Sequence, residues 1–172
     1  PSDEALDAAV LTRINEQRAL NMLAPYPSQA QLVQAARRHV HDMADNDVFT
    51  HTGSDGSTAA QRIAEACYEA AWTSEIIGWG FPTVDAMMGW WLDSDTHRQT
   101  ILNVSLEEMG VAYLRQPDSS FTHYWTVTFA KAASSTADAP FYHCETRLVE
   151  PGRGLSVQWW QDEPCPASGE IP

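Results

Sequence analysis

The stretches GVAYLRQ, residues 110–116, and HYWTVTFA, residues 123–130, decide the fold class of this chain. In the second stretch the apolar residues Trp125, Val127 and Phe129 occupy alternate positions, as on a strand with one face against a core. The intervening QPDSS is rich in turn-forming residues and is typical of a hairpin connection. We therefore expect two antiparallel strands joined by a tight turn.

Four segments before this hairpin predict helices. In each of them apolar residues recur three and four positions apart, as they do along one face of an α-helix. Two helices are expected over residues 3–20 and about 29–46. The third is expected to begin after Ser57 or Thr58 and the fourth after Thr83, because hydroxyl side chains cap the first turn of a helix.

The order of these elements predicts the architecture. A short apolar stretch, TSEIIGWG at residues 73–80, lies between the third and fourth helices and is expected to form a further strand. Helices before and between antiparallel strands indicate an α+β fold in which helices cover an antiparallel sheet. We expect the following side chains to share one core: Met43, Ile63, Trp91, Val127 and Phe129.

The chain of 172 residues fits a single domain with some length left over. Its composition changes after Lys131, where ASSTADAP is small, polar and ends in proline. Residues 132–140 are therefore expected to form a linker and residues 141–172 a C-terminal tail, which leaves the domain at residues 1–131. The chain begins with Pro1 and an acidic stretch, so we expect no signal peptide and interpret it as a trimmed, mature form.

The charge balance excludes one class of partner. Ten basic residues stand against 23 acidic ones, for a net charge of −13. A surface this negative repels phosphate backbones, so the chain is not expected to bind nucleic acid. No apolar run reaches about 20 residues, the length that crosses a membrane, so no membrane span is expected either.

Three cysteines, with no CxxC pair among them, argue against a structural zinc knuckle. Cys67 follows Ile63 on one face of the third helix, so we expect it to be buried, reduced and inert. Cys144 and Cys165 are then expected to pair in an oxidising compartment. Their disulfide would close a loop of about 20 residues and keep the tail docked on the domain.

Two histidines and one glutamate are a candidate set of metal ligands. His51 lies in the loop FTHTGSDGS, where the backbone positions the side chain, and His97 lies in DSDTHRQTILN near the end of the fourth helix. Glu75 lies in an apolar stretch, where a carboxylate is costly unless it is paired or coordinating. Imidazole and carboxylate suit zinc, copper or nickel. Gaps of 24 and 22 residues mean that three separate elements would have to converge.

Other side chains are assigned to the surroundings of this set or to the core. Trp72 and Trp79 flank Glu75 in sequence and are expected to rim a cleft, since indole rings are amphipathic. Trp90 has the spacing of a core residue. His39 lies on an apolar helix face and is expected to be a core histidine satisfied by one hydrogen bond.

Several strings stand in an order that is hard to produce by chance. FTHTGSDGS at residues 49–57 and the segment Ser94–Leu102 are the most specific, and EEMGVAYL and HYWTVTFA follow them. From about residue 10 to 131 the chain resembles the CAP superfamily, which contains the cysteine-rich secretory, antigen-five and pathogenesis-related proteins, and within it a bacterial SCP-like extracellular type. The resemblance implies a three-layer α-β-α sandwich, usually secreted, with a central antiparallel sheet between helices.

The resemblance also implies a site. Its cleft holds two histidines and one or two acidic residues, and by position His51, Glu75 and His97 match them. Such clefts are reported to take zinc or another divalent cation. Some members of the superfamily bind sterols or fatty acids, and most have no established enzymatic activity.

The sequence departs from the family pattern at this site. Ser74 and Ile76 replace the glycine and asparagine that flank the glutamate in the family. The second acidic residue has no clear match, and Asp93 or Asp95 is expected to stand in for it at the cleft. An aspartate is one carbon shorter than a glutamate, so its carboxylate reaches less far.

The sequence thus predicts a secreted, monomeric binding module rather than an enzyme. Its cleft of His51, Glu75 and His97 would bind a divalent cation and a small apolar ligand or an extracellular partner. The alternative is a metal-dependent hydrolase or protease, in which Glu75 or an aspartate acts as the base on a metal-bound water. A third interpretation is a surface protein-interaction domain whose Trp159–Trp160 tail contacts a partner.

Overall fold

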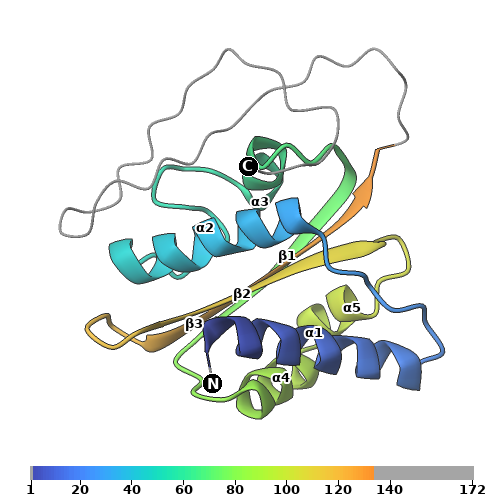
Figure 1. The fold of residues 1–172 in the computed structure, drawn as a ribbon, viewed down its shortest axis with the longest axis horizontal. Coiled ribbons are helices and arrows are strands. Elements are labelled where there is room, and N and C mark those ends of the chain that lie inside the picture. The colour runs from blue at the N-terminus through green and yellow to red at the C-terminus, as the bar shows by residue number, and fades with distance from the viewer. Residues whose placement is uncertain (1, 134–172) are drawn as a thin grey trace.

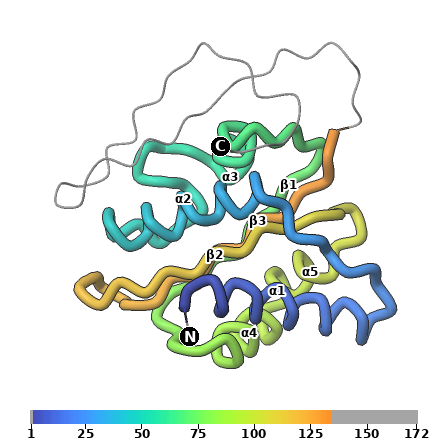
Figure 2. The backbone as a smooth tube through the Cα atoms, in the orientation of Figure 1, coloured from blue at the N-terminus to red at the C-terminus, as the bar shows by residue number. Residues whose placement is uncertain are grey.

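The computed structural model describes residues 2–133 and folds them into three layers. In chain order the elements are α1 (Asp3–Leu20), α2 (Ala30–Asn46), α3 (Ala59–Glu65), β1 (Ala70–Trp79), α4 (Val84–Asp93), α5 (Asp95–Ile101), β2 (Glu108–Gln116) and β3 (Thr122–Ala132). The three strands form the middle layer. Helices α2 and α3 lie on one face of the sheet, and α1, α4 and α5 lie on the other (Figure 1 and Figure 2). The expected α-β-α sandwich is confirmed.

The sheet has the strand order β1-β3-β2, so the last of these strands in the chain lies in the centre. β2 and β3 pair antiparallel through the predicted hairpin, with Val111 opposite Val127. β1 pairs antiparallel with the other side of β3 and places Ile76 opposite Val127 as well. The hairpin is therefore confirmed, and the stretch expected as a short strand forms the ten-residue β1.

All four predicted helices are present in residues 2–133, but the fourth is divided. α4 begins after the predicted cap Thr83, whose side chain accepts a hydrogen bond from the amide of Ala86. It ends at Asp93, because Ser94 adopts an extended backbone conformation, and α5 starts at the next residue. His97 therefore lies on a separate helix, and its expected place near the end of the fourth helix is wrong.

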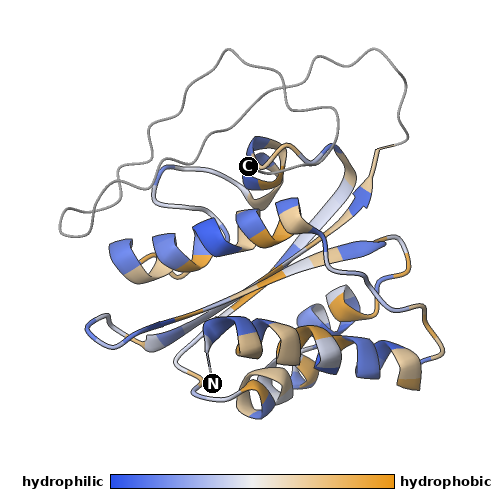
Figure 3. Cartoon of the chain, in the orientation of Figure 1, coloured by the Kyte–Doolittle hydropathy of each residue, from blue (hydrophilic) through white to orange (hydrophobic). Residues whose placement is uncertain are grey.

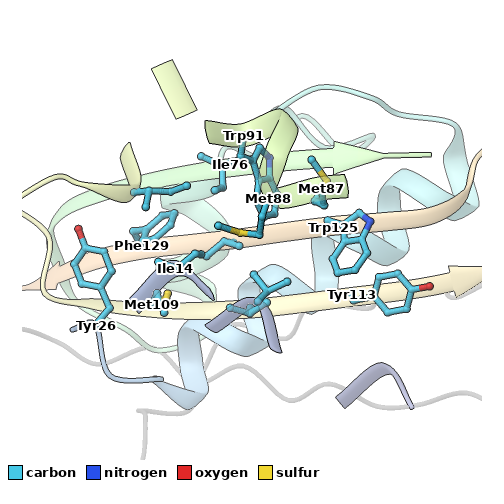
Figure 4. Close-up of a cluster of buried hydrophobic side chains, with 14 of the residues drawn as sticks. Ile14, Tyr26, Ile76, Met87, Met88, Trp91, Met109, Tyr113, Trp125 and Phe129 are labelled. Carbon is cyan, nitrogen blue, oxygen red and sulfur yellow. The ribbon is translucent and has the colours of Figure 1, made fainter. Parts of the chain in front are cut away.

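The sheet separates two groups of buried side chains, and hydrophobic residues gather where the helices meet the sheet (Figure 3). On one side Trp125 and Val127 pack with Trp91 in the largest cluster (Figure 4). Met43 and Ile63 are also fully buried, but they belong to clusters on the opposite face. The expectation of one common core is wrong, because a central sheet with helices on both faces creates two.

Helix α2 crosses directly over Gly110 of β2. A Cβ atom at this position would lie 2.0 Å from the carbonyl carbon of Leu32 and 2.1 Å from the amide nitrogen of Val33. Both are backbone atoms that cannot turn aside, so only glycine allows this approach. Thr128 Oγ1 also donates to the carbonyl of Leu32 at 2.8 Å. α2 is thereby anchored to β3 as well, which fixes the helix from which the neighbouring loop departs.

Strand β2 forms one edge of the sheet, and two segments of the chain cover part of that edge. The amide of Met109 donates to the carbonyl of Pro27 at 3.0 Å, and the carbonyl of Met109 accepts from the amide of Gln29 at 2.9 Å. Further along, the amide of Tyr113 donates to Asp7 Oδ1 at 2.6 Å. Backbone groups of an edge strand that could otherwise pair with another strand thus have partners within the chain.

The cysteines differ from expectation. Cys67 follows α3 with a φ of 60° and is half-buried, so it does not share the helical face of Ile63. Its sulfur takes part in a disulfide, so the expected reduced thiol is wrong. Cys144 and Cys165 lie outside the described residues. The pairing expected between them stays a prediction, one that an intramolecular disulfide of Cys67 would exclude.

The end of the domain is described only in part. β3 continues to Ala132, one residue beyond the expected domain end. The rest of the expected linker after residue 133, and the tail at 141–172, lie outside the described residues. Within residues 2–133, no helix is both long and apolar enough to cross a membrane.

Trp91→Ala is expected to lower the free energy of unfolding by about 3–5 kcal/mol. The indole is fully buried and its Nε1–H donates to the carbonyl of Ile77 at 2.9 Å, so the substitution leaves a cavity and an unpaired carbonyl. Urea denaturation followed by circular dichroism measures the change. Trp72→Ala is the matched control, because this indole is 65% exposed and its loss should change the value by less than about 0.5 kcal/mol. Equal midpoints for Trp91→Ala and the wild type would contradict the burial.

Candidate functional site

Glu75 of β1 is a buried carboxylate with three basic neighbours. Its side chain is 2% exposed. Nδ1 of His51 lies 2.9 Å from Oε1, and Nη2 of Arg62 donates to Oε2 at 2.8 Å. Nε2 of His39 lies 3.7 Å from Oε1. The carboxylate that the sequence marks as costly unless paired or coordinating is therefore paired.

Arg62 of α3 is the cation of this pair, and it is not among the residues that the sequence pattern indicates. Its side chain is 1% exposed. Nη2 donates to the carbonyl of His51 at 3.1 Å as well as to Glu75, and Nη1 donates to the carbonyl of Ser57 at 2.9 Å. Arg62 thus connects α3, β1 and the loop between α2 and α3. The sequence feature that could have indicated Arg62 is Glu75 in its apolar stretch, because a buried carboxylate needs a cation within reach.

The loop that carries His51, residues 47–58, is also tied to α2. Three side chains of α2 have partners in it: His39 with the Thr50 carbonyl at 3.0 Å, Asp42 with the Ser54 amide at 2.8 Å, and Arg38 with Asp55 at 2.6 Å. These are polar contacts, and they replace the apolar packing that such a loop lacks. The position of His51 is therefore set by hydrogen bonds on both sides of the loop.

His51 is the exposed member of the group, with 57% of its side chain accessible. A carboxylate can only accept a hydrogen bond, so Nδ1 of a neutral His51 carries the proton that it donates to Glu75. Nε2 is then unprotonated and has a lone pair available to a ligand. The contact with Glu75 thus orients His51 and favours the tautomer that is protonated on Nδ1.

His97 of α5 is half-buried and is held by an aromatic ring. Its imidazole lies against Trp90, with ring centroids 4.8 Å apart. Its Nδ1 is buried and has no hydrogen-bond partner in the described part of the chain. Burial lowers the pKa of His97, and the charge of a protonated His51 lowers it further. Trp90 is 42% exposed, so its expected place in the core is wrong, because its ring covers an imidazole instead.

Basic neighbours lower the pKa of Glu75, whereas burial lowers the pKa of His39. Burial would raise the pKa of Glu75, but the hydrogen bond from His51 and the charges of His39 and Arg62 together hold it below its ordinary value. Burial lowers the pKa of His39 and outweighs the opposite effect of Glu75. His39 is buried with one hydrogen bond, to the carbonyl of Thr50, as expected, but its place beside Glu75 makes it part of the site.

The four residues expected to line the cleft, Asp93, Asp95, Trp72 and Trp79, are not among the partners of Glu75, and their place at a cleft stays a prediction. The basic partners of Glu75 within residues 2–133 are His39, His51 and Arg62, and none of the four joins them. Asp93 is exposed, and Asp95 pairs with an arginine of its own helix. Trp79 packs against Phe49, with ring centroids 5.4 Å apart, and Trp72 is 65% exposed. Neither aspartate takes the place of the missing second acidic residue at Glu75.

The candidate donors to a cation at this site are imidazole nitrogens. Within residues 2–133, no three His, Cys, Asp or Glu side chains gather as a metal-holding group. Both oxygens of Glu75 already accept hydrogen bonds, so this carboxylate does not fit the role of a third ligand. The candidate nitrogens are Nε2 of His51 and the unpartnered Nδ1 of His97. Nδ1 of His39 also lacks a partner within residues 2–133, but this side chain is fully buried.

A profile of the Cysteine-rich secretory protein family, CAP, matches residues 11–129 of this chain. The chain belongs to the CAP family. The match includes all three of the residues His51, Glu75 and His97, and it confirms the resemblance seen in the sequence strings.

The CAP domain has bacterial relatives. The chain is 25% identical over 122 residues to the "Uncharacterized membrane protein YlbC" of Bacillus subtilis, which is 71% of this chain and 33% of that protein. It is 26% identical over 113 residues to the "Uncharacterized protein YkwD" of the same organism, which is 66% of this chain and 44% of that protein. The chain therefore spans less than half the length of these curated relatives.

Solved structures share the fold of the CAP domain. An outer surface protein from Borrelia burgdorferi superimposes with a TM-score of 0.68 at 24% identity, over 73% of this chain and 92% of that one. An extracellular protein containing an SCP domain from Bacillus anthracis gives a TM-score of 0.68 at 22% identity, over 75% of this chain and 41% of that one. At these identities the similarity establishes the three-layer fold.

Lowering the pH below 6.5 is expected to destabilise the CAP domain through His39. The pKa of His39 in the folded protein lies below its ordinary value near 6.5, so the unfolded chain takes up a proton that the folded chain resists. The stabilisation by neutral His39 is therefore complete above pH 6.5 and is lost as the pH falls toward the folded-state pKa. His39→Gln removes this titration and keeps an amide that can donate to the carbonyl of Thr50.

The measurement is the free energy of urea unfolding of the wild type and His39→Gln between pH 5 and 8. The difference between the two proteins isolates His39, because other shifted groups titrate in both. Asp7 is one of these, since burial raises its pKa to about 6 and gives it the opposite pH dependence. A difference that stays constant over this range would contradict the neutral burial of His39.

Proposed function

We propose that this CAP domain is an extracellular binding module that holds a divalent cation, zinc in the first place, through His51 and His97. The observation that supports this most is the hydrogen bond from His51 Nδ1 to Glu75, which leaves Nε2 unprotonated on an exposed ring. A carboxylate behind an imidazole is the usual support of a metal-ligating histidine. Imidazole nitrogen is in turn a preferred ligand of zinc.

His97 supplies the second nitrogen of the proposed site. Its ring is oriented by Trp90, and its buried Nδ1 has no partner among the described residues. Burial lowers the pKa of His97, which favours the neutral imidazole that metal binding requires. A bound divalent cation would supply a Lewis acid with coordination positions open to a further ligand.

The surroundings of His97 favour a further ligand with an apolar part. Trp90 is 42% exposed next to this histidine, and Phe81 lies against Trp90 with ring centroids 5.6 Å apart. Aromatic faces of this kind bury the apolar surface of a small molecule while leaving its polar end in water. We therefore include a small apolar ligand in the proposal.

The extracellular and monomeric state is proposed on a separate basis. Two solved proteins of the same fold are described as an outer surface protein and an extracellular protein. The monomer is supported by the β2 edge, where Asp7 and the backbone around Pro27 already pair with the strand. The interaction surface expected at Trp159–Trp160 lies outside the described residues and stays a prediction.

The contacts of Glu75 favour a binding module over a metal-dependent hydrolase. A general base needs a free oxygen within reach of the water it activates. Glu75 is 2% exposed, and His51 and Arg62 occupy its two oxygens. Its pKa is also held below the ordinary value by these neighbours against the effect of burial, which makes it a weak base. The same features suit a residue that supports His51.

Zinc is expected to bind the wild-type protein more weakly at pH 5.5 than at pH 7.5, because a protonated imidazole cannot coordinate. His51→Ala and His97→Ala should each weaken binding at pH 7.5 by about tenfold or more, since even the support of a ligand contributes that much. Calorimetric titration with zinc chloride measures all three proteins.

His123→Ala is the control for this titration. His123 of β3 bonds to Tyr113 of β2 at 2.7 Å, and neither residue is a proposed ligand or contacts Glu75, so its loss should leave the zinc affinity unchanged. Equal affinities in the wild type, His51→Ala and His97→Ala would exclude the proposed site.

A further inference from the structure

We propose that Arg62 is a positioning residue that keeps His51 in the Nδ1–H tautomer and so leaves its Nε2 available to a ligand. Arg62 acts through two intermediaries, the carboxylate of Glu75 and the backbone of His51. The expected effect of Arg62 on zinc affinity rests on the proposed function. The tautomer itself is a property of the metal-free protein.

One amino group of Arg62 contacts both partners of the His51–Glu75 hydrogen bond. Nη2 donates to Glu75 Oε2 at 2.8 Å and to the carbonyl of His51 at 3.1 Å. The other carboxylate oxygen, Oε1, lies 2.9 Å from His51 Nδ1. The three residues thus form a closed ring of contacts. Within it the backbone and the imidazole of His51 are both positioned relative to the same guanidinium group.

Burial explains why Glu75 cannot hold this arrangement alone. The side chains of Arg62 and Glu75 are 1% and 2% exposed, so water cannot solvate either charge. Without the guanidinium, the carboxylate would be an uncompensated buried charge, and it would turn toward solvent. Nδ1 of His51 would then lose its acceptor, and its proton would be free to occupy Nε2, as in an unrestrained histidine. The nitrogen that should face a ligand would become a donor.

The second arm of Arg62 adds a positional constraint. Nη1 donates to the carbonyl of Ser57 at 2.9 Å, and Ser57 follows His51 in the same loop. Arg62 therefore holds the loop at two points as well as the carboxylate. A lysine at this position would keep the positive charge but could not make these contacts together, because its ammonium lacks the planar fork of a guanidinium.

The test reads the tautomer of His51 from imidazole ¹⁵N shifts in the metal-free, full chain at a fixed pH of about 8, where an unperturbed imidazole is neutral. The wild type should carry the proton on Nδ1. Arg62→Met, which keeps an apolar stem and removes the charge, should move the proton to Nε2 and weaken zinc binding by about tenfold or more. Arg62→Lys should give an intermediate tautomer ratio.

Arg38→Met is the matched control. Arg38 pairs with Asp55 of the same loop and with Glu65 of α3, so its loss removes charge contacts of the loop without touching Glu75. The tautomer should stay on Nδ1 in this variant.

Two results would overturn the role of Arg62. One is a wild-type His51 protonated on Nε2, and the other is a wild-type tautomer ratio in the Arg62 variants. If Arg62→Met does not fold, the wild-type and Arg62→Lys spectra decide the question. A tautomer that moves while zinc fails to bind any of the proteins would leave the role of Arg62 standing and remove the proposed function.

Discussion

The buried ion pair between Arg62 and Glu75 is the interaction on which the site depends. Moving two charges out of water costs several kcal/mol for each, and their attraction offsets this cost only when further hydrogen bonds complete the geometry. Arg62 gains such bonds with the carbonyls of His51 and Ser57, although its Nε has no partner within residues 2–133, and Glu75 gains one with the imidazole of His51. The shape of the loop is therefore a consequence of electrostatics, because the loop carbonyls are needed to satisfy the guanidinium group.

The position of this pair in the fold decides what it can support. β1 is an edge strand, with α3 on one face of the sheet and α5 on the other. Glu75 of β1 orients His51, which lies in the loop before α3, whereas His97 belongs to α5 in the opposite layer. Burial lowers the pKa of His97, and the charge of a protonated His51 adds to this effect. A ligand held by both imidazoles, as proposed, would therefore bridge the two helical layers around the edge of the sheet.

Local patterns in the sequence predict most of the fold and half of the site. The alternation from Trp125 to Phe129 and the cap at Thr83 depend on neighbouring residues, so they can be read without the structure. The apolar surroundings of Glu75 predict that it needs a partner. They do not identify Arg62, because the two residues meet only when α3 packs on β1. The predicted core position of Trp90 and the predicted place of His97 on the fourth helix are also wrong. Trp90 does have helical spacing, but the helix ends at Ser94, and His97 of the next helix lies against the indole.

The two edge strands of the sheet, β1 and β2, differ in the groups that cover them. On β1 the edge carries polar chemistry, whereas on β2 the amide of Tyr113 is closed by a carboxylate of α1 and that of Met109 by a carbonyl before α2. The carboxylate of Asp7 accepts the hydrogen bond that the backbone of a fourth strand would otherwise accept. It occupies one edge amide that a strand from another copy of the protein would need, and it adds no chain length. A further strand could pair at Tyr113 only if α1 first moved away from β2, so the first helix covers part of this edge as well as contributing to the core.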